Sequence, residues 1–323
     1  MLNIQKILLP VDFPNTSLRV VHQAATLAHH FQSEIVMLHV VTAQSHAAGV
    51  PEDGPELAGW DMLAAMVREA QENQQDESLG PELEGLAIER RLVKGDPARA
   101  IVQTAQGEKA DLIMMPSHGY TFNQFLLGSV TAKVLHGSEC PVWTGPHVEE
   151  PEGPPTPNDP LFLFGGVGLR DEELTQIDGQ EVKKQPVQGF AIHNVLCAVD
   201  LGPRTDEAVS WAAQMAAEFG ARLTLAHVTP SVERWGPGGS YVDHRWKEAL
   251  VSDASQRIAR LQQDMGLNAD VLIGSGDAPK VLNQAVKQTK ADLLVTGCYP
   301  YGGNLRMHGY AIICAVPIPV LSV

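Results

Sequence analysis

Short apolar runs alternate with segments of helical periodicity along the first half of the chain. The run "KILLPVDF" (6–13) is typical of a central parallel strand, because such a strand is buried on both faces. Residues 16–32 carry apolar side chains three and four positions apart, which predicts an amphipathic helix. Further strands are predicted at 34–41, 86–95, 111–116 and 141–144, and further helices at 57–77, 97–107 and 128–137. This alternation indicates a parallel sheet with right-handed crossovers and helices on both faces.

The same pattern occurs twice. Residues 6–41 align without a gap with residues 194–229, at a constant offset of 188 (219−31) that pairs Phe31 with Phe219. Further on, "KADLIMMPSHG" (109–119) corresponds to "KADLLVTGCYP" (290–300). One domain is therefore used twice. The predicted fold class is α/β, with two tandem doubly wound parallel-sheet domains of the Rossmann-like, adenine nucleotide alpha hydrolase-like kind.

The stretch between the copies has a different composition. "HVEEPEGPPTPNDP" (147–160) is rich in proline and acidic residues, which is typical of a linker. We therefore predict domains at 1–147 and 193–323, joined by a segment at 148–192. The apolar start of residues 161–192 is compatible with a local hairpin.

Composition narrows the classes of partner. The 323 residues carry a formal net charge of −15, and no basic stripe of the kind used for nucleic acids is present. No stretch approaches the roughly 20 apolar residues that cross a bilayer. The four cysteines lack the spacing of a metal site, a redox pair or a disulfide framework. We expect a cytoplasmic protein that binds neither nucleic acid nor membrane.

Ligands of such sheets bind beyond the carboxyl ends of the strands. The loop after the fourth strand reaches a predicted helix at Gly128-Ser129, where free backbone N–H groups and the positive dipole end favour a phosphate. Gly119 would turn the loop over the ligand, and the hydroxyls of Ser129 and Thr131 would add donors. A plain serine N-cap beside a turn glycine explains the same residues, and from these residues alone it is the favoured interpretation.

Other polar residues also have structural explanations. Asp12 and Asp200 end the first strand of each copy, where a carboxylate either binds an adenine amine or a ribose hydroxyl or caps the following helix. His39 and His227 interrupt apolar strands and are interpreted as satisfied core or edge histidines. His22 shares a helix face with a second histidine, but zinc requires more ligands. No nucleophile elbow or Gly-x-x-x-x-Gly-Lys phosphate loop is present, and no enzyme is indicated.

These motifs together resemble a tandem universal stress protein. The resemblance rests on "ILLPVDF" and "VLCAVDL", on "MLHVV" and "LAHVT", on "KGDPARAI", and on "KADLIMMPSHG" with "LLGSVTAKVLHGSECPVW". It covers nearly everything except residues 148–192. It implies two five-stranded domains that pair through their last strands, here within one chain, and it leaves open a homodimer of two chains.

ATP-binding members of that family carry Gly-x-x-Gly, nine residues, then Gly-Ser or Gly-Thr. The resemblance therefore implies a site for ATP, accompanied by Mg²⁺. Here Pro116 replaces the first glycine and removes a backbone donor, and the spacer has eight residues. The implied binding residues are, for the base and ribose side, Pro10, Val11, Asp12, Val41 and Met115, and for the phosphates, Gly119, Gly128, Ser129, Val130 and Thr131.

The second copy departs differently. Gly297 and Gly309 keep two motif glycines, but Pro300 replaces another, and Tyr310 stands where Ser129 stands in the first copy. We expect the tyrosine ring to occupy the phosphate space of its own copy, which leaves a degraded or altered pocket.

We therefore expect a stress-response protein that binds an adenine nucleotide mainly in its first domain and is at most a slow ATPase. The alternative is a signalling or scaffold module that acts through protein partners. An ATP-pyrophosphatase-like ligase would need a Ser-Gly-Gly-type loop after the first strand, where this chain has "FPNTS" at 13–17.

Overall fold

The computed structural model describes residues 2–11, 18–42, 83, 85–117, 127–146, 191–231, 233–236, 239–242, 244–297 and 305–323. Residues 1–148 and 190–323 form one compact unit, and residues 149–189 lie outside the described residues. The predicted helix at 57–77 also lies outside them. No helix within the described ranges is long and apolar enough to cross a membrane.

The first half has the predicted order of elements. Pro97 opens α4, and Asp96 before it accepts a hydrogen bond from the backbone N–H of Arg99 at 3.0 Å, so the start of this helix is capped by a side chain. The elements are β1 (Lys6–Val11), α1 (Leu18–Phe31), β2 (Glu34–Val41), β3 (Ile88–Lys94), α4 (Pro97–Glu108), β4 (Leu112–Met115), α5 (Ser129–Gly137) and β5 (Val142–Thr144).

The second half repeats this order and contains a hairpin after β7. The antiparallel pair β8–β9 precedes a long helix, α8, and was not predicted. The elements are β6 (Asn194–Ala198), α7 (Thr205–Phe219), β7 (Arg222–Thr229), β8 (Glu233–Gly236), β9 (Gly239–Val242), α8 (His244–Met265), β10 (Asp270–Ser275), α9 (Ala278–Thr289), β11 (Leu293–Thr296), α10 (Leu305–Ala315) and β12 (Val320–Ser322).

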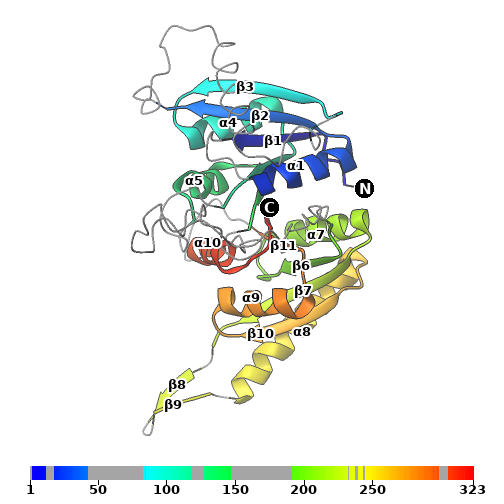
Figure 1. Cartoon of the computed structure of the whole chain (residues 1–323). Coiled ribbons are helices and arrows are strands. Elements are labelled where there is room, and N and C mark those ends of the chain that lie inside the picture. The colour runs from blue at the N-terminus through cyan, green and yellow to red at the C-terminus, as the bar shows by residue number, and fades with distance from the viewer. Residues whose placement is uncertain are drawn as a thin grey trace, which may run out of the picture. The chain divides into compact units, whose positions relative to one another are not determined.

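Both halves contribute five strands to one sheet, in the order β10-β7-β6-β11-β12-β5-β4-β1-β2-β3. All neighbours within a half are parallel, and β5 and β12 are antiparallel (Figure 1). Trp143 is in register with Leu321, its counterpart in the other half. Each half is doubly wound, because strand order reverses at β1 and at β6. The mixed α/β prediction is confirmed.

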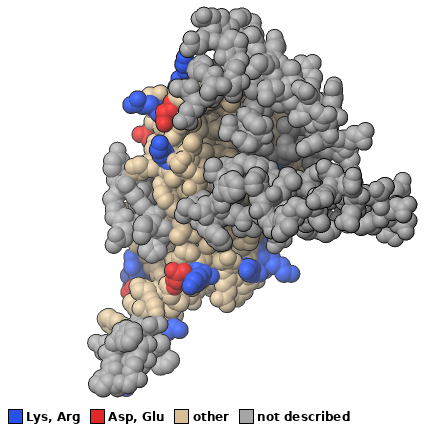
Figure 2. All heavy atoms as spheres, turned by 60° about the vertical axis from the view of Figure 1, so that its left-hand side comes forward, with Lys and Arg blue, Asp and Glu red and all other residues tan. Residues whose placement is uncertain are grey.

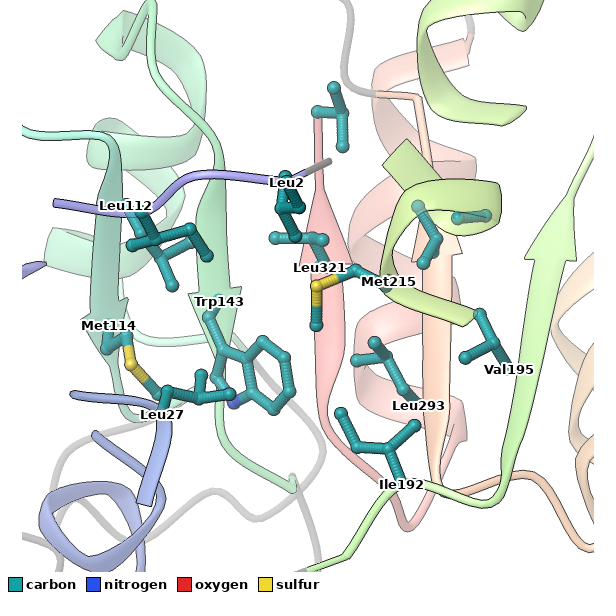
Figure 3. Packing of buried hydrophobic residues seen from close by; sticks show 14 of the residues in the cluster. Leu2, Leu27, Leu112, Met114, Trp143, Ile192, Val195, Met215, Leu293 and Leu321 are labelled. Carbon is teal, nitrogen blue, oxygen red and sulfur yellow. The ribbon is translucent and has the colours of Figure 1, made fainter. Parts of the chain in front are cut away.

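One hydrophobic core lies on each face of the sheet. The first includes buried residues of α1, α7 and α8, and the second includes those of α4, α5, α9 and α10. Trp143 is fully buried in the first, near the seam between β5 and β12 (Figure 3). Its Nε1 donates to the side chain of Gln23 at 3.0 Å, so the polar atom of the indole is satisfied. Each core continues across both halves.

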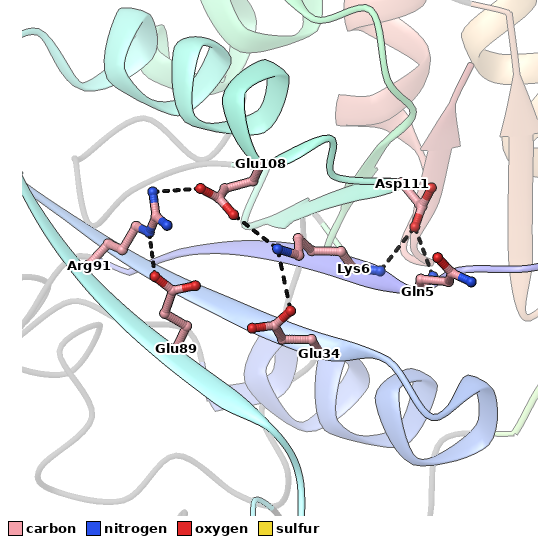
Figure 4. A network of polar contacts seen from close by, with 7 residues as sticks. All are labelled: Gln5, Lys6, Glu34, Glu89, Arg91, Glu108 and Asp111. Atoms are coloured by element: carbon pink, nitrogen blue, oxygen red, sulfur yellow. Dashed lines mark hydrogen bonds and ion pairs between the residues drawn. The ribbon is translucent and has the colours of Figure 1, made fainter.

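An aspartate fixes the first strand of each half. Asp111, just before β4, accepts hydrogen bonds from the backbone N–H groups of Gln5 and Lys6 at 2.8 and 3.0 Å (Figure 4). Asp292 accepts in the same way from His193 and Asn194 at 2.7 and 2.9 Å. The "KAD" motif is therefore structural: its carboxylate joins β4 to β1, and β11 to β6.

A network of charged side chains surrounds Lys6, at the start of β1 in the first half. Lys6 Nζ lies 2.9 Å from Glu108 and 3.3 Å from Glu34, and Arg91 contacts both Glu108 and Glu89 (Figure 4). The hydrogen bond from Lys6 lowers the pKa of the Glu108 carboxyl, and the Arg91 charge adds to this against the opposing effect of burial. Glu108 is therefore held in its ionised form.

Candidate functional site

The carboxyl ends of β1, β2 and β4 meet at one edge of the sheet. Of the predicted site residues, Pro10 and Val11 end β1, Val41 ends β2 and Met115 ends β4. Val11 and Met115 are buried, while Pro10 and Val41 are half-buried. Asp12 and Gly119, which the sequence places beside them, lie outside the described residues.

A histidine holds the end of the first strand in each half. His39 Nδ1 lies 3.0 Å from the carbonyl oxygen of Val11, and His227 Nδ1 lies 2.6 Å from that of Val199. Because a carbonyl only accepts, Nδ1 carries the proton in both rings. The prediction of satisfied histidines is confirmed, and the main chain beside Asp12 is held in place by this bond.

Helix α5 begins at Ser129, with Gly128 as its N-cap residue. Gly128 has φ −58° and ψ 139°, and no side-chain hydrogen bond from the described residues caps the helix. The Ala132 N–H donates to the Gly128 carbonyl at 2.8 Å, as the first intrahelical bond. The alternative prediction of a serine N-cap is therefore wrong, because the cap position is one residue earlier and has no side chain.

Two hydrogen bonds fix how the loop after β4 returns to α5. The Gly128 N–H donates to the Ser117 carbonyl at 2.9 Å, and the buried Thr131 hydroxyl donates to the Pro116 carbonyl at 3.0 Å. Pro116 lacks an N–H, but its carbonyl anchors the first turn of α5. The hydroxyl proton of Thr131 is therefore already donated to the protein's own backbone, whereas Ser129 is exposed at the start of the helix.

The corresponding aspartate of the second half serves the local turn. Asp200 Oδ1 accepts from the N–H of Gly202 and from the hydroxyl of Thr205, both at 2.8 Å. These bonds close the turn that leads into α7, in line with the structural interpretation of this residue.

Tyr310 makes a contact that the sequence does not predict. Its hydroxyl donates to the carbonyl of Ala132 at 2.8 Å, in α5 of the first half. This contact with the other half was not predicted from the sequence, and the expectation that the ring occupies the phosphate space of its own copy stays a prediction. The sequence held no signal for this contact, since it depends on β5 and β12 placing α10 near α5.

The cysteines that the structure describes are not activated nucleophiles. Cys140, Cys197 and Cys314 are free thiols. Burial raises the pKa of the Cys197 thiol to about 12, and burial also raises the pKa of Cys140 and of Cys314. Among the described residues, no group of three or more His, Cys, Asp or Glu side chains is arranged to hold a metal ion.

Neither of two surface cavities coincides with this edge. One of about 410 Å³ is lined by Asp111, Cys140 and Trp211, and one of about 390 Å³ by Ala221 and Asp270. Both lie at the amino ends of the strands. We favour the opposite edge as the site, because ligands of doubly wound sheets bind at the carboxyl ends.

In the view of Figure 2, the described charged side chains are scattered and form no basic stripe.

Comparison with known proteins gives consistent matches. A model of the universal stress protein family matches residues 3–144 and 191–308. The chain is 33% identical over 140 residues to Universal stress protein MJ0531 of Methanocaldococcus jannaschii, which covers 43% of this chain and 79% of that protein.

Two solved structures share the fold over nearly the whole chain. A universal stress protein from Archaeoglobus fulgidus DSM 4304 has a TM-score of 0.59 at 20% identity, covering 99% of this chain and 96% of that one. A functionally unknown protein, PA1789 from Pseudomonas aeruginosa PAO1, has a TM-score of 0.61 at 15% identity, covering 99% and 92%.

Proposed function

Because the chain belongs to the universal stress protein family, we propose that it binds ATP or a related adenine nucleotide in its first half. It serves a stress response and is at most a slow ATPase. A reducing, cytoplasmic setting is part of this proposal and is supported by the free thiols of Cys140, Cys197 and Cys314.

The observation that carries the proposal is the start of α5. Asp96 caps α4 with its carboxylate, but Gly128 offers α5 no side chain, and no other side chain in the described part of the protein caps the amides of Ser129 and Val130. Backbone N–H groups and the positive dipole end at a helix start favour an anion. The phosphates would therefore meet Gly119, Ser129, Val130 and Thr131, the last through its backbone, and Gly128 would let them approach closely while its own N–H donates to Ser117.

The base and ribose belong at the strand ends in this proposal. Val11 and Met115 supply apolar surface, with Pro10 and Val41 beside them, and Asp12 would accept from the base or the ribose. Mg²⁺ would be held chiefly by the phosphates and water, which is how this ion usually binds. The second half has Tyr310 in place of Ser129, and we assign it no nucleotide of its own.

Calorimetric titration of ATP into the full chain tests the proposal. Ser129→Tyr places a ring at the first helical position and should weaken binding at least tenfold. His136→Tyr places the same ring on an exposed position two turns later on α5 and should leave binding unchanged. The absence of binding at millimolar ATP, or equal loss in both variants, would overturn the proposal.

The alternative function is a scaffold or signalling module that binds protein partners. It is favoured by residues 148–192, whose composition differs from both halves. In that case ATP has no effect, and deletion of 148–192 abolishes partner capture without changing the thermal unfolding of the rest.

A further inference from the structure

The second half contacts the proposed phosphate-binding turn of the first. The hydroxyl of Tyr310 on α10 donates to the carbonyl of Ala132 on α5 at 2.8 Å. The amide of Ala132 in turn donates to the carbonyl of Gly128, the cap residue, at 2.8 Å. Tyr310 therefore holds one end of the helical turn whose other end is the glycine cap.

The residue before that glycine is also related to α10. Cys314 follows Tyr310 by four positions on α10, so both side chains share one face of the helix. Burial raises the pKa of the Cys314 thiol, and the backbone of Leu127, the residue before Gly128, opposes this shift. Leu127 and Tyr310 also pack against the same hydrophobic core. Tyr310 on α10 and Leu127 before the cap are therefore parts of the same packed region.

We propose that Tyr310 is a positioning residue for the phosphate-binding turn of the first half, which makes nucleotide binding there depend on the docking of α10. This inference rests on the proposed function. It gives a role to the second half, which carries Tyr310 where the first carries Ser129: its helix orders the turn of the other copy. Binding and docking are reciprocal, so nucleotide also strengthens the contact between α5 and α10.

Tyr310→Phe tests this in the full chain, because it keeps the ring and removes only the donor. The matched control is Thr144→Val, which removes a different hydrogen bond between the halves, from Thr144 Oγ1 on β5 to the carbonyl of Val320 at 3.2 Å. Two measurements are made on each: calorimetric titration with ATP, and hydrogen exchange of peptides covering 127–134 without nucleotide. We expect Tyr310→Phe to weaken ATP binding about three- to tenfold, the usual effect of one lost hydrogen bond. We also expect faster exchange in that segment, and neither change in Thr144→Val.

The outcomes separate this inference from the proposed function. If wild type binds ATP and Tyr310→Phe binds equally well, the positioning role is overturned and the nucleotide site stands. If both variants lose affinity equally, the effect is a general loosening of the two halves, which also overturns it. If wild type binds no ATP, the proposed function fails. Exchange at 127–134 then decides whether Tyr310 orders the turn: faster exchange in Tyr310→Phe alone supports the role, and unchanged exchange overturns it.

Discussion

Phe31 and Phe219 occupy the same position in the two copies, and their rings meet edge to face with centroids 6.0 Å apart. The residues just before them also meet. The ring of His30 stacks on that of Phe219 with centroids 4.4 Å apart, and His30 Nε2 lies 3.2 Å from Oε1 of Glu218, the residue that corresponds to His30 in the second copy. Contacts between equivalent positions are the mark of a two-fold interface. This pseudo-two-fold relates helices α1 and α7, as the Trp143–Leu321 pair relates β5 and β12.

Loss of the aromatic contact should destabilise the protein as a whole. Phe219→Ala removes a half-buried ring that two rings of the other half contact, and we expect it to lower the free energy of unfolding by about 2 kcal/mol. Urea denaturation measures this as a lower midpoint. Phe219→Leu keeps most of the apolar volume and should lose less. An unchanged midpoint in Phe219→Ala would show that the α1–α7 contact contributes nothing to stability.

A backbone position that differs between the copies offers a stabilising change. Gln32 follows α1 with φ 57°, in the left-handed region, and Gly220 takes the same conformation after α7 with φ 61°. A side chain strains this conformation and glycine does not. Gln32→Gly should therefore raise stability by about 0.5–1 kcal/mol, measured by thermal unfolding. The reverse change, Gly220→Gln, should lower it by a similar amount, and equal signs for the two variants would contradict the argument.

Low pH should lower the stability of the first half, because it protonates Glu108. The pKa of this carboxyl is lowered below its ordinary value of 4.5, chiefly by the hydrogen bond from Lys6. A carboxyl with a lowered folded-state pKa contributes its full stability above the unfolded-state pKa, and this contribution is lost as pH falls through the folded-state value. Thermal midpoints at pH 7 and pH 3 should therefore differ more in wild type than in Glu108→Gln. Parallel losses in the two proteins would show that the network does not carry the acid sensitivity.

Much of the fold could be predicted because the local pattern agrees with the tertiary structure. Runs such as 34–41 are buried strands, and the order of elements repeats wherever the sequence repeats. The hairpin β8–β9 was missed, although "WGPGGSY" carries a turn signal between aromatic residues.

The site was harder to predict because its hydrogen bonds join distant segments. Residue spacing cannot show that the Thr131 hydroxyl donates to Pro116, fifteen residues earlier, or that Gly128 rather than Ser129 is the cap. The contact of Tyr310 with Ala132 depends on the antiparallel seam. Pairing through the last strands followed only from the family resemblance, since hydrophobic periodicity identifies a strand but not its partner.

The seam itself should determine whether the halves unfold together. Leu321 is buried opposite Trp143, so Leu321→Arg places a charge in the first hydrophobic core, where burial of an unpaired charge is strongly unfavourable. Because both cores continue across the seam, we expect wild type to unfold in one transition and Leu321→Arg to unfold in two, with helical circular dichroism largely retained before the first. Leu321→Met, which keeps the volume, should retain one transition. A single unchanged transition in Leu321→Arg would mean that the seam does not couple the two halves.

We also propose that β5 and β12 pair with each other within one chain, so that the two halves need no second chain as a partner. Light scattering of wild type should then give the monomer mass of 34.9 kDa.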